Sequence, residues 1–177
     1  GQAIENQQPA TLAWGSGTAT FATNRRNNPE GEAARLRAEG KLAGPFDHDV
    51  PILTVRSDDG KLQAIVFGYA CHNTTLDSAV WSGDYAGFAQ MEVETAHPGA
   101  VAMFWAGCGG DQNPLPRRRE EFARDYGKQL GLAFQVVDDL LDLTQDSAAT
   151  GKPAMNDIKE GRITLPAAFW NQKMTNW

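Results

Sequence analysis

The chain has 177 residues and a formal net charge of −6. That length suits one domain with a proper core and is too short for two large domains. An acidic chain of ordinary hydrophobic content does not predict a nucleic-acid or anionic-membrane surface. We find no signal peptide and no apolar run of the about 20 residues that a membrane span needs, so we expect a soluble protein of unknown compartment.

The first 45 residues form a polar segment rich in Gly, Asn and Gln. One short helix is expected over 30–39, because Gly40 follows it in the usual C-terminal position. The two cysteines, Cys71 and Cys108, each follow an apolar run. We expect both to be reduced core residues, since the chain is not a disulfide-dense scaffold.

A hairpin is expected next, because two apolar, β-branched runs flank a turn sequence. The runs are 50–56 and 62–70, separated by Asp58-Asp59-Gly60. Residues 84–97 then predict a helix that ends before Pro98.

A continuous apolar run at 100–107 predicts a strand buried on both faces. A long helix is expected over 118–143. The order strand, helix, strand, helix predicts an α/β fold: a small parallel or mixed sheet flanked by helices, with a long C-terminal helix.

Polar residues follow the ends of two of the predicted strands. His72 stands after the run at 62–70, and Asp111 follows Gly109-Gly110 after the run at 100–107. Neutral imidazole and carboxylates on strand-end loops suit a metal-assisted hydrolase. The alternative, which the spacing leaves equally open, is that the glycines form turns and that Asp84 caps the helix after it.

Residues 9–131 resemble the N-terminal catalytic region of the neutral/alkaline non-lysosomal ceramidase family. The matching stretches include VFGYACHNTTL, WSGDYAGFAQ and GAVAMFWAGCGGDQNPLPR. The resemblance implies zinc-dependent cleavage of the amide of an N-acylsphingosine, with His72 as one zinc ligand. Such a zinc site keeps an open position for water or substrate.

The chain departs from that family at its catalytic turn. Asn113 stands in Gly110-Asp111-Gln112-Asn113-Pro114 where characterised ceramidases have a serine. An amide is no nucleophile, so Asn113 is a candidate for orienting a water or an oxyanion, and Asp111 is a candidate catalytic carboxylate. The other zinc ligands of the family have no counterpart in this chain, so the zinc site is incomplete.

A second candidate site lies on the predicted long helix. Asp138 and Asp142 fall about 40° apart beyond one edge of its apolar stripe, and Asp139 falls beyond the other edge. Mg²⁺ prefers such oxygen ligands, and Lys152 and Arg162 would then meet a diphosphate. From spacing alone, solvated acidic residues near a helix end are the competing explanation.

Two segments within residues 126–166 resemble the second aspartate-rich region of trans-isoprenyl diphosphate synthases, the polyprenyl synthetase family. Their sequences are YGKQLGLAFQVVDDLLDLT and GKPAMNDIKEGRITLP. The resemblance implies that the three aspartates bind Mg²⁺ and an allylic diphosphate, that Gln135 lines the same pocket, and that Lys152 contacts phosphate. That family is an all-α bundle. Its first aspartate-rich motif and its arginines for the second substrate are absent here.

We therefore expect an apparent chimera: a polar segment at 1–45, a ceramidase-like core at 46–125, a prenyl-synthase-like helix and loop at 126–166, and an unassigned tail at 167–177. Three functions stay open. The chain is a ceramidase-like fragment inactive alone, a prenyl synthase fragment that binds Mg²⁺ and diphosphate, or a folded non-catalytic module. The first two imply a lipid-type small-molecule substrate, ceramide-like or an isoprenyl diphosphate, and no nucleic acid. Whether a partner chain completes either site stays open.

Overall fold

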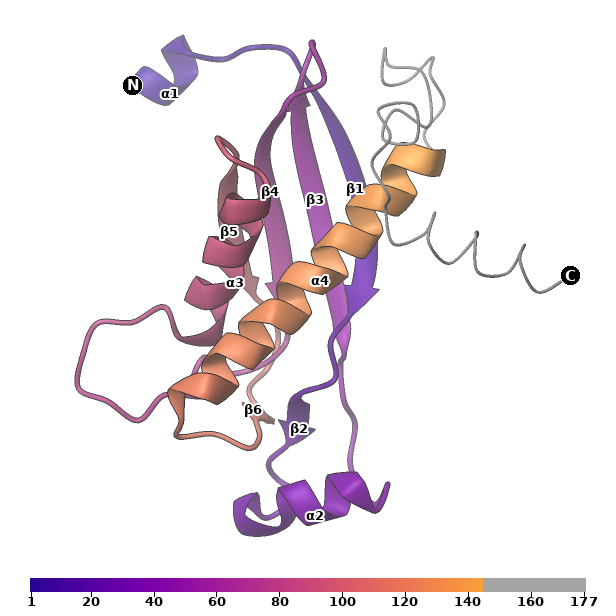
Figure 1. The fold of residues 1–177 in the computed structure, drawn as a ribbon, viewed down its shortest axis with the longest axis vertical. Helices are drawn as coiled ribbons and strands as arrows, with labels where there is room; N and C mark the ends of the chain where they lie inside the picture. Colours follow the sequence, from indigo (N-terminus) through magenta and orange to yellow (C-terminus); the bar gives the residue numbers. More distant parts are fainter. Residues whose placement is uncertain (145–177) are drawn as a thin grey trace, which may run out of the picture.

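The structure is a computed structural model that describes residues 1–144, with only the backbone described for 142–144. The chain forms four helices, one short 3-10 helix and six strands within this part (Figure 1). In chain order they are α1 Gln2–Glu5, β1 Ala10–Thr18, β2 Ala22–Asn24, η1 Glu30–Glu32, α2 Ala33–Ala38, β3 Asp49–Ser57, β4 Leu62–Tyr69, α3 Asp84–Ala96, β5 Val101–Ala106, β6 Gln112–Pro114 and α4 Glu120–Thr144.

The main sheet has four strands in the order β1-β3-β4-β5. β1 pairs antiparallel with β3, and β3 and β4 form the expected antiparallel hairpin. β4 and β5 run parallel and are joined through α3, as a crossover connection requires. The predicted mixed α/β fold is therefore confirmed, and the polar N-terminal segment adds an edge strand that its sequence did not predict. β2 and β6 form a separate two-stranded pair.

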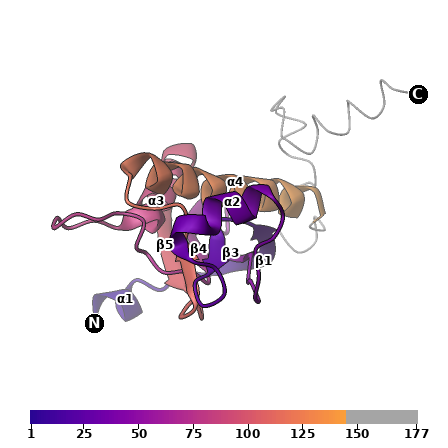
Figure 2. The ribbon, with the colours of Figure 1, turned by 90° about the horizontal axis from the view of Figure 1, so that it is seen from below.

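Helices α3 and α4 pack side by side and cover one face of the sheet (Figures 1 and 2). The core between the sheet and these two helices is apolar, and both layers contribute side chains to it. Its largest fully buried side chains include Phe21, Phe67, Tyr69, Tyr85 and Phe134. Burying one such side chain stabilises the fold by about 1.5–3 kcal/mol. This layer therefore supplies most of the fold's stability.

Two glycines on β1 let α4 approach the sheet closely. A Cβ atom on Gly15 would lie 2.6 Å from Val137 Cγ1, and one on Gly17 would lie 2.9 Å from Ala133 Cβ. The helix carries its apolar stripe without interruption from Tyr126 through Leu130 to Val137. The helix expected over 118–143 is thus confirmed, as α4 over Glu120–Thr144, and the residues of this stripe belong to one core.

The opposite face of the sheet is open, which corrects one expectation. The strand at 100–107 was expected to be buried on both faces, yet Val101, Met103 and Trp105 of β5 are exposed. An apolar run alone cannot distinguish a strand covered on two faces from one covered on a single face.

The two cysteines are free, and they differ in their surroundings. Cys71 is buried as expected, whereas Cys108 is exposed, so the expectation of two core cysteines is wrong for Cys108. Cys108 lies in the glycine-rich loop beyond the end of β5, outside the packed layer. Within residues 1–144, no helix is both long and apolar enough to cross a membrane.

Candidate functional site

His72 lies three residues beyond the end of β4 and is fixed by the backbone of Gln112. The His72 backbone N–H donates to the Gln112 carbonyl oxygen at 3.1 Å, and its ring Nδ1 lies 2.8 Å from the same oxygen. Because a carbonyl oxygen only accepts, Nδ1 carries the proton in this contact. The lone pair then resides on Nε2, which is the arrangement of a metal-binding or basic imidazole.

Asp111 is held at the same edge of the sheet by two side-chain amides. Its Oδ2 accepts from Asn24 Nδ2 at 2.8 Å, and its Oδ1 accepts from Gln112 Nε2 at 3.0 Å. Asn24 belongs to β2 and is only 2% exposed. These contacts fix the carboxylate in one orientation, as a positioned base or orienting group requires.

Asn113 is buried in β6, where it pairs in register with Thr23 of β2. The short strand therefore carries Gln112 and Asn113 to the loop that contains His72. The structure thus places His72, Asp111 and Asn113, which the sequence proposed, around Gln112: His72 contacts its carbonyl oxygen, and the other two are its neighbours in the chain. We call these, with Asn24 and Gln112, the strand-end cluster.

The strand-end cluster supplies few metal ligands by itself. Among the residues that the structure describes, no three His, Cys, Asp or Glu side chains are placed to share a metal ion. His72 has a suitable Nε2, but a tetrahedral zinc site needs three or four protein ligands. Any zinc at this position would therefore require ligands from outside residues 1–144.

Asp84 takes a structural part beside this cluster. Its carboxylate accepts hydrogen bonds from the backbone N–H groups of Thr75, Leu76 and Tyr85, at 2.8–3.0 Å. The residue is 6% exposed and has a positive φ of 53°. Three N–H donors satisfy the buried charge and fasten the loop after His72 to the start of α3.

The aspartate-rich end of α4 is the second candidate site, and Asp138 is its best-defined member. Asp138 Oδ1 accepts from Arg56 Nη2 of β3 at 2.5 Å. The side chains are 15% and 28% exposed, so water screens the pair only partly. Sequence reasoning had no signal for this contact, because the two residues are 82 positions apart.

The neighbouring site residues lie on the two sides of the helix. Gln135 lines a groove between α3 and α4, whereas Asp138 faces β3. Asp139 is half-buried, and the backbone of Asp142 lies one turn beyond Asp138. Lys152 and Arg162 fall outside the described residues. The structure therefore does not place Gln135 and Asp138 in one pocket.

Comparison with known proteins finds the polyprenyl synthetase family over residues 76–176, which is more than half of the chain. The chain therefore belongs to the polyprenyl synthetase family. A prenyl transferase of Synechocystis sp. is 46% identical over 68 residues, covering 38% of this chain and 21% of that protein. Solanesyl diphosphate synthase 2 of Arabidopsis thaliana is 59% identical over 44 residues, covering 25% of this chain and 11% of that protein. The chain thus spans only a small part of these relatives.

Two solved structures with a similar fold are ceramidases. A ceramidase complexed with C2 has a TM-score of 0.56 at 22% identity, covering 71% of this chain and 22% of that one. Neutral ceramidase from Pseudomonas aeruginosa has a TM-score of 0.56 at 21% identity, covering 75% of this chain and 24% of that one. At this identity the likeness establishes a shared fold.

Proposed function

We propose that this chain binds an isoprenyl diphosphate together with Mg²⁺ through the aspartate-rich end of α4, without transferring a prenyl group by itself. We further propose that the chain joins a ceramidase-type fold over residues 9–131 to the second aspartate-rich region of a polyprenyl synthase over 126–166. The observation that carries the proposal is the family match over 76–176, which includes Asp138, Asp139 and Asp142 on one helix.

The packing of α4 supports a rigid platform for such a site. Val137 is buried against the sheet, and the Arg56 contact sets the direction of Asp138. A carboxylate has two oxygens, so Asp138 is able to meet Arg56 with one and a hard cation with the other. The three aspartates would hold Mg²⁺, which would supply positive charge toward a diphosphate, and Lys152 and Arg162 would add to that charge.

Binding without turnover follows from the number of ligands. The resemblance to polyprenyl synthases implies two facing aspartate-rich helices, and this chain carries one such motif. One aspartate-rich motif supplies only part of the ligands for the metal ions that would neutralise the diphosphate's charge. Ionisation of an allylic substrate therefore lacks most of its electrostatic stabilisation.

Isothermal titration with farnesyl diphosphate tests this proposal. We expect binding in the presence of Mg²⁺ that disappears with EDTA and weakens at least tenfold in Asp139→Asn. Asp125→Asn is the matched control, because Asp125 is an exposed aspartate near the start of the same helix. Absence of binding by the wild-type chain, or binding that ignores Mg²⁺, would refute the proposal.

A ceramidase-like amide hydrolase is the second candidate, favoured by the strand-end cluster. The Nδ1 contact of His72 leaves Nε2 oriented as a zinc ligand, and Asp111 is fixed nearby by two amides. We expect little zinc retention and no cleavage of an N-acylsphingosine by the isolated chain, because the ligand set is incomplete. Stoichiometric zinc that is lost in His72→Ala would instead favour this candidate. A chain that binds neither zinc nor diphosphate would be a folded, non-catalytic α/β module.

A further inference from the structure

The open face of the sheet is an apolar surface that no element among residues 1–144 covers. The strand registers arrange its outward side chains in rows across the four strands. The rows are Leu12–Val55–Ala64–Val101, then Trp14–Leu53–Val66–Met103, then Ser16–Pro51–Gly68–Trp105. Within them only Ser16 carries a polar side chain. Such a contiguous exposed apolar face is a candidate binding surface.

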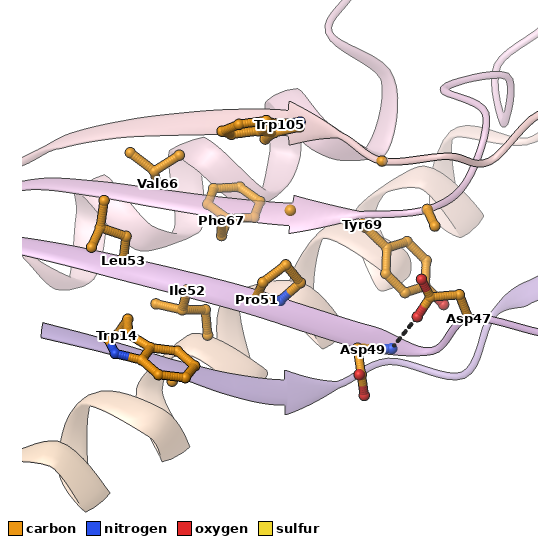
Figure 3. A pocket seen from close by; sticks show the side chains of 14 residues that line it. Trp14, Asp47, Asp49, Pro51, Ile52, Leu53, Val66, Phe67, Tyr69 and Trp105 are labelled. Carbon is orange, nitrogen blue, oxygen red and sulfur yellow. Dashed lines mark hydrogen bonds between the residues drawn. The ribbon is translucent and has the colours of Figure 1, made fainter.

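The surface is hollowed along its middle. Trp14 and Trp105 stand on the outer strands β1 and β5 and are 80% and 71% exposed. Between them, outward residues of β3 and β4 form an apolar floor, and Gly68, which has no side chain, lies next to Pro51. The cavity has a volume of about 410 Å³, within the range of sites that hold small ligands. Figure 3 shows the tryptophans flanking this floor.

One end of the hollow is acidic. Asp47 and Asp49 line it beside the ends of β3 and β4, and the Asp49 backbone N–H donates to Asp47 Oδ1 at 3.1 Å (Figure 3). Among the described residues that line the hollow, none is a lysine or an arginine. The hollow therefore presents an apolar floor, two aromatic walls and negative charge at one end.

We propose that this hollow binds an amphiphile with a cationic head: its alkyl chain lies along β3 and β4 between Trp14 and Trp105, and its ammonium group meets Asp47 and Asp49. The apolar floor recognises the chain through buried area. The two carboxylates recognise the charge, and the tryptophan rings flank the alkyl chain. This inference does not depend on the aspartate-rich end of α4.

Titration with decyltrimethylammonium below its micelle concentration tests the inference. We expect saturable binding, with decyl sulfate and decyl maltoside binding at least tenfold more weakly because they lack a positive head. Comparison with the octyl and nonyl homologues should show an affinity gain of about fourfold for each methylene added. Equal binding of the anionic and cationic amphiphiles would overturn the charge recognition.

Matched variants locate the site. The double variant Asp47→Asn/Asp49→Asn should lose about tenfold in affinity, and Trp105→Ala should lose at least as much. Asp58→Asn/Asp125→Asn removes the same charge elsewhere, and Trp81→Ala removes an exposed tryptophan outside the hollow, so neither should change binding. Unchanged binding in Trp105→Ala would overturn the inference. A wild-type dimer in sedimentation that dissociates in Trp105→Ala would also overturn the inference, because a second copy of the chain would then cover the face.

Discussion

At the scale of single residues, the two cysteines show how surroundings decide reactivity. Cys71 is buried beneath the strand-end loops, and desolvation raises the pKa of its thiol, since burial disfavours the charged thiolate. The thiolate is the nucleophile in alkylation. Alkylation of Cys71 is therefore slow for two reasons: the reagent has little access to the thiol, and the thiol stays protonated.

We therefore expect one cysteine of the native chain to react rapidly with iodoacetamide at pH 8. Cys108 is exposed and should account for the rapid modification. Mass spectrometry should find one added group in the wild type, none in Cys108→Ser over the same time, and two after denaturation. Rapid double labelling of the native protein would show that Cys71 is not buried.

At the scale of elements, the crossing of α3 and α4 depends on a glycine. A Cβ atom on Gly127 would lie 2.6 Å from Phe88 Cβ and 2.9 Å from the backbone N of Ala89. The tip of a flexible side chain could move aside to relieve such a contact, but the backbone of α3 cannot. Gly127→Ala should therefore lower the free energy of unfolding by about 1–3 kcal/mol, despite the better helix propensity of alanine.

Gly87 on α3 provides the control for this substitution. A Cβ atom there would meet nothing within 4 Å, so Gly87→Ala should stabilise the chain by up to about 1 kcal/mol. Urea denaturation followed by circular dichroism measures both changes. Equal effects of the two substitutions would mean that the helices do not cross at Gly127.

The contact between Arg56 and Asp138 ties the aspartate-rich end of α4 to β3. In a partly buried pair, loss of either partner leaves the other charge without compensation. A double-mutant cycle with Arg56→Gln and Asp138→Asn should give a coupling of about 1–3 kcal/mol in the free energy of unfolding. Additive single effects would place the two side chains apart.

The elements with strong periodic patterns could be predicted from the sequence. The β3–β4 hairpin, α3 and α4 follow from alternation, turn residues and the stripe at helical spacing. β1 could not be predicted, because Gly15 and Gly17 read as loop residues until α4 is known to approach them. The open face was missed for a related reason: a continuous apolar run does not show whether a second layer covers the strand.

The candidate sites could be predicted only as lists of residues. The sequence placed His72 and Asp111 at strand ends, which the parallel pairing of β4 and β5 confirms. It gave no sign that Asn24 holds Asp111 or that Arg56 holds Asp138, since each contact joins segments more than 80 residues apart. Long-range pairs of this kind depend on the assembled sheet.

At the scale of the whole molecule, the central feature is the continuity of α4. One helix carries both the apolar stripe that completes a ceramidase-type sheet layer and the aspartates of a polyprenyl synthetase family member. A ligand bound at the end of that helix should therefore stabilise the entire domain, because the helix cannot unfold without exposing the core that it covers.

Thermal unfolding with and without Mg²⁺ and inorganic pyrophosphate tests this account most directly. Without ligand, circular dichroism and tryptophan fluorescence should report one common transition. With both ligands at about a hundredfold excess over Kd, binding adds about 2.7 kcal/mol, so the Tm should rise by about 5–10 °C. The shift should fall to about half or less in Asp139→Asn, because at least tenfold weaker binding leaves at most about 1.4 kcal/mol. A wild-type Tm that pyrophosphate and Mg²⁺ leave unchanged would contradict the account.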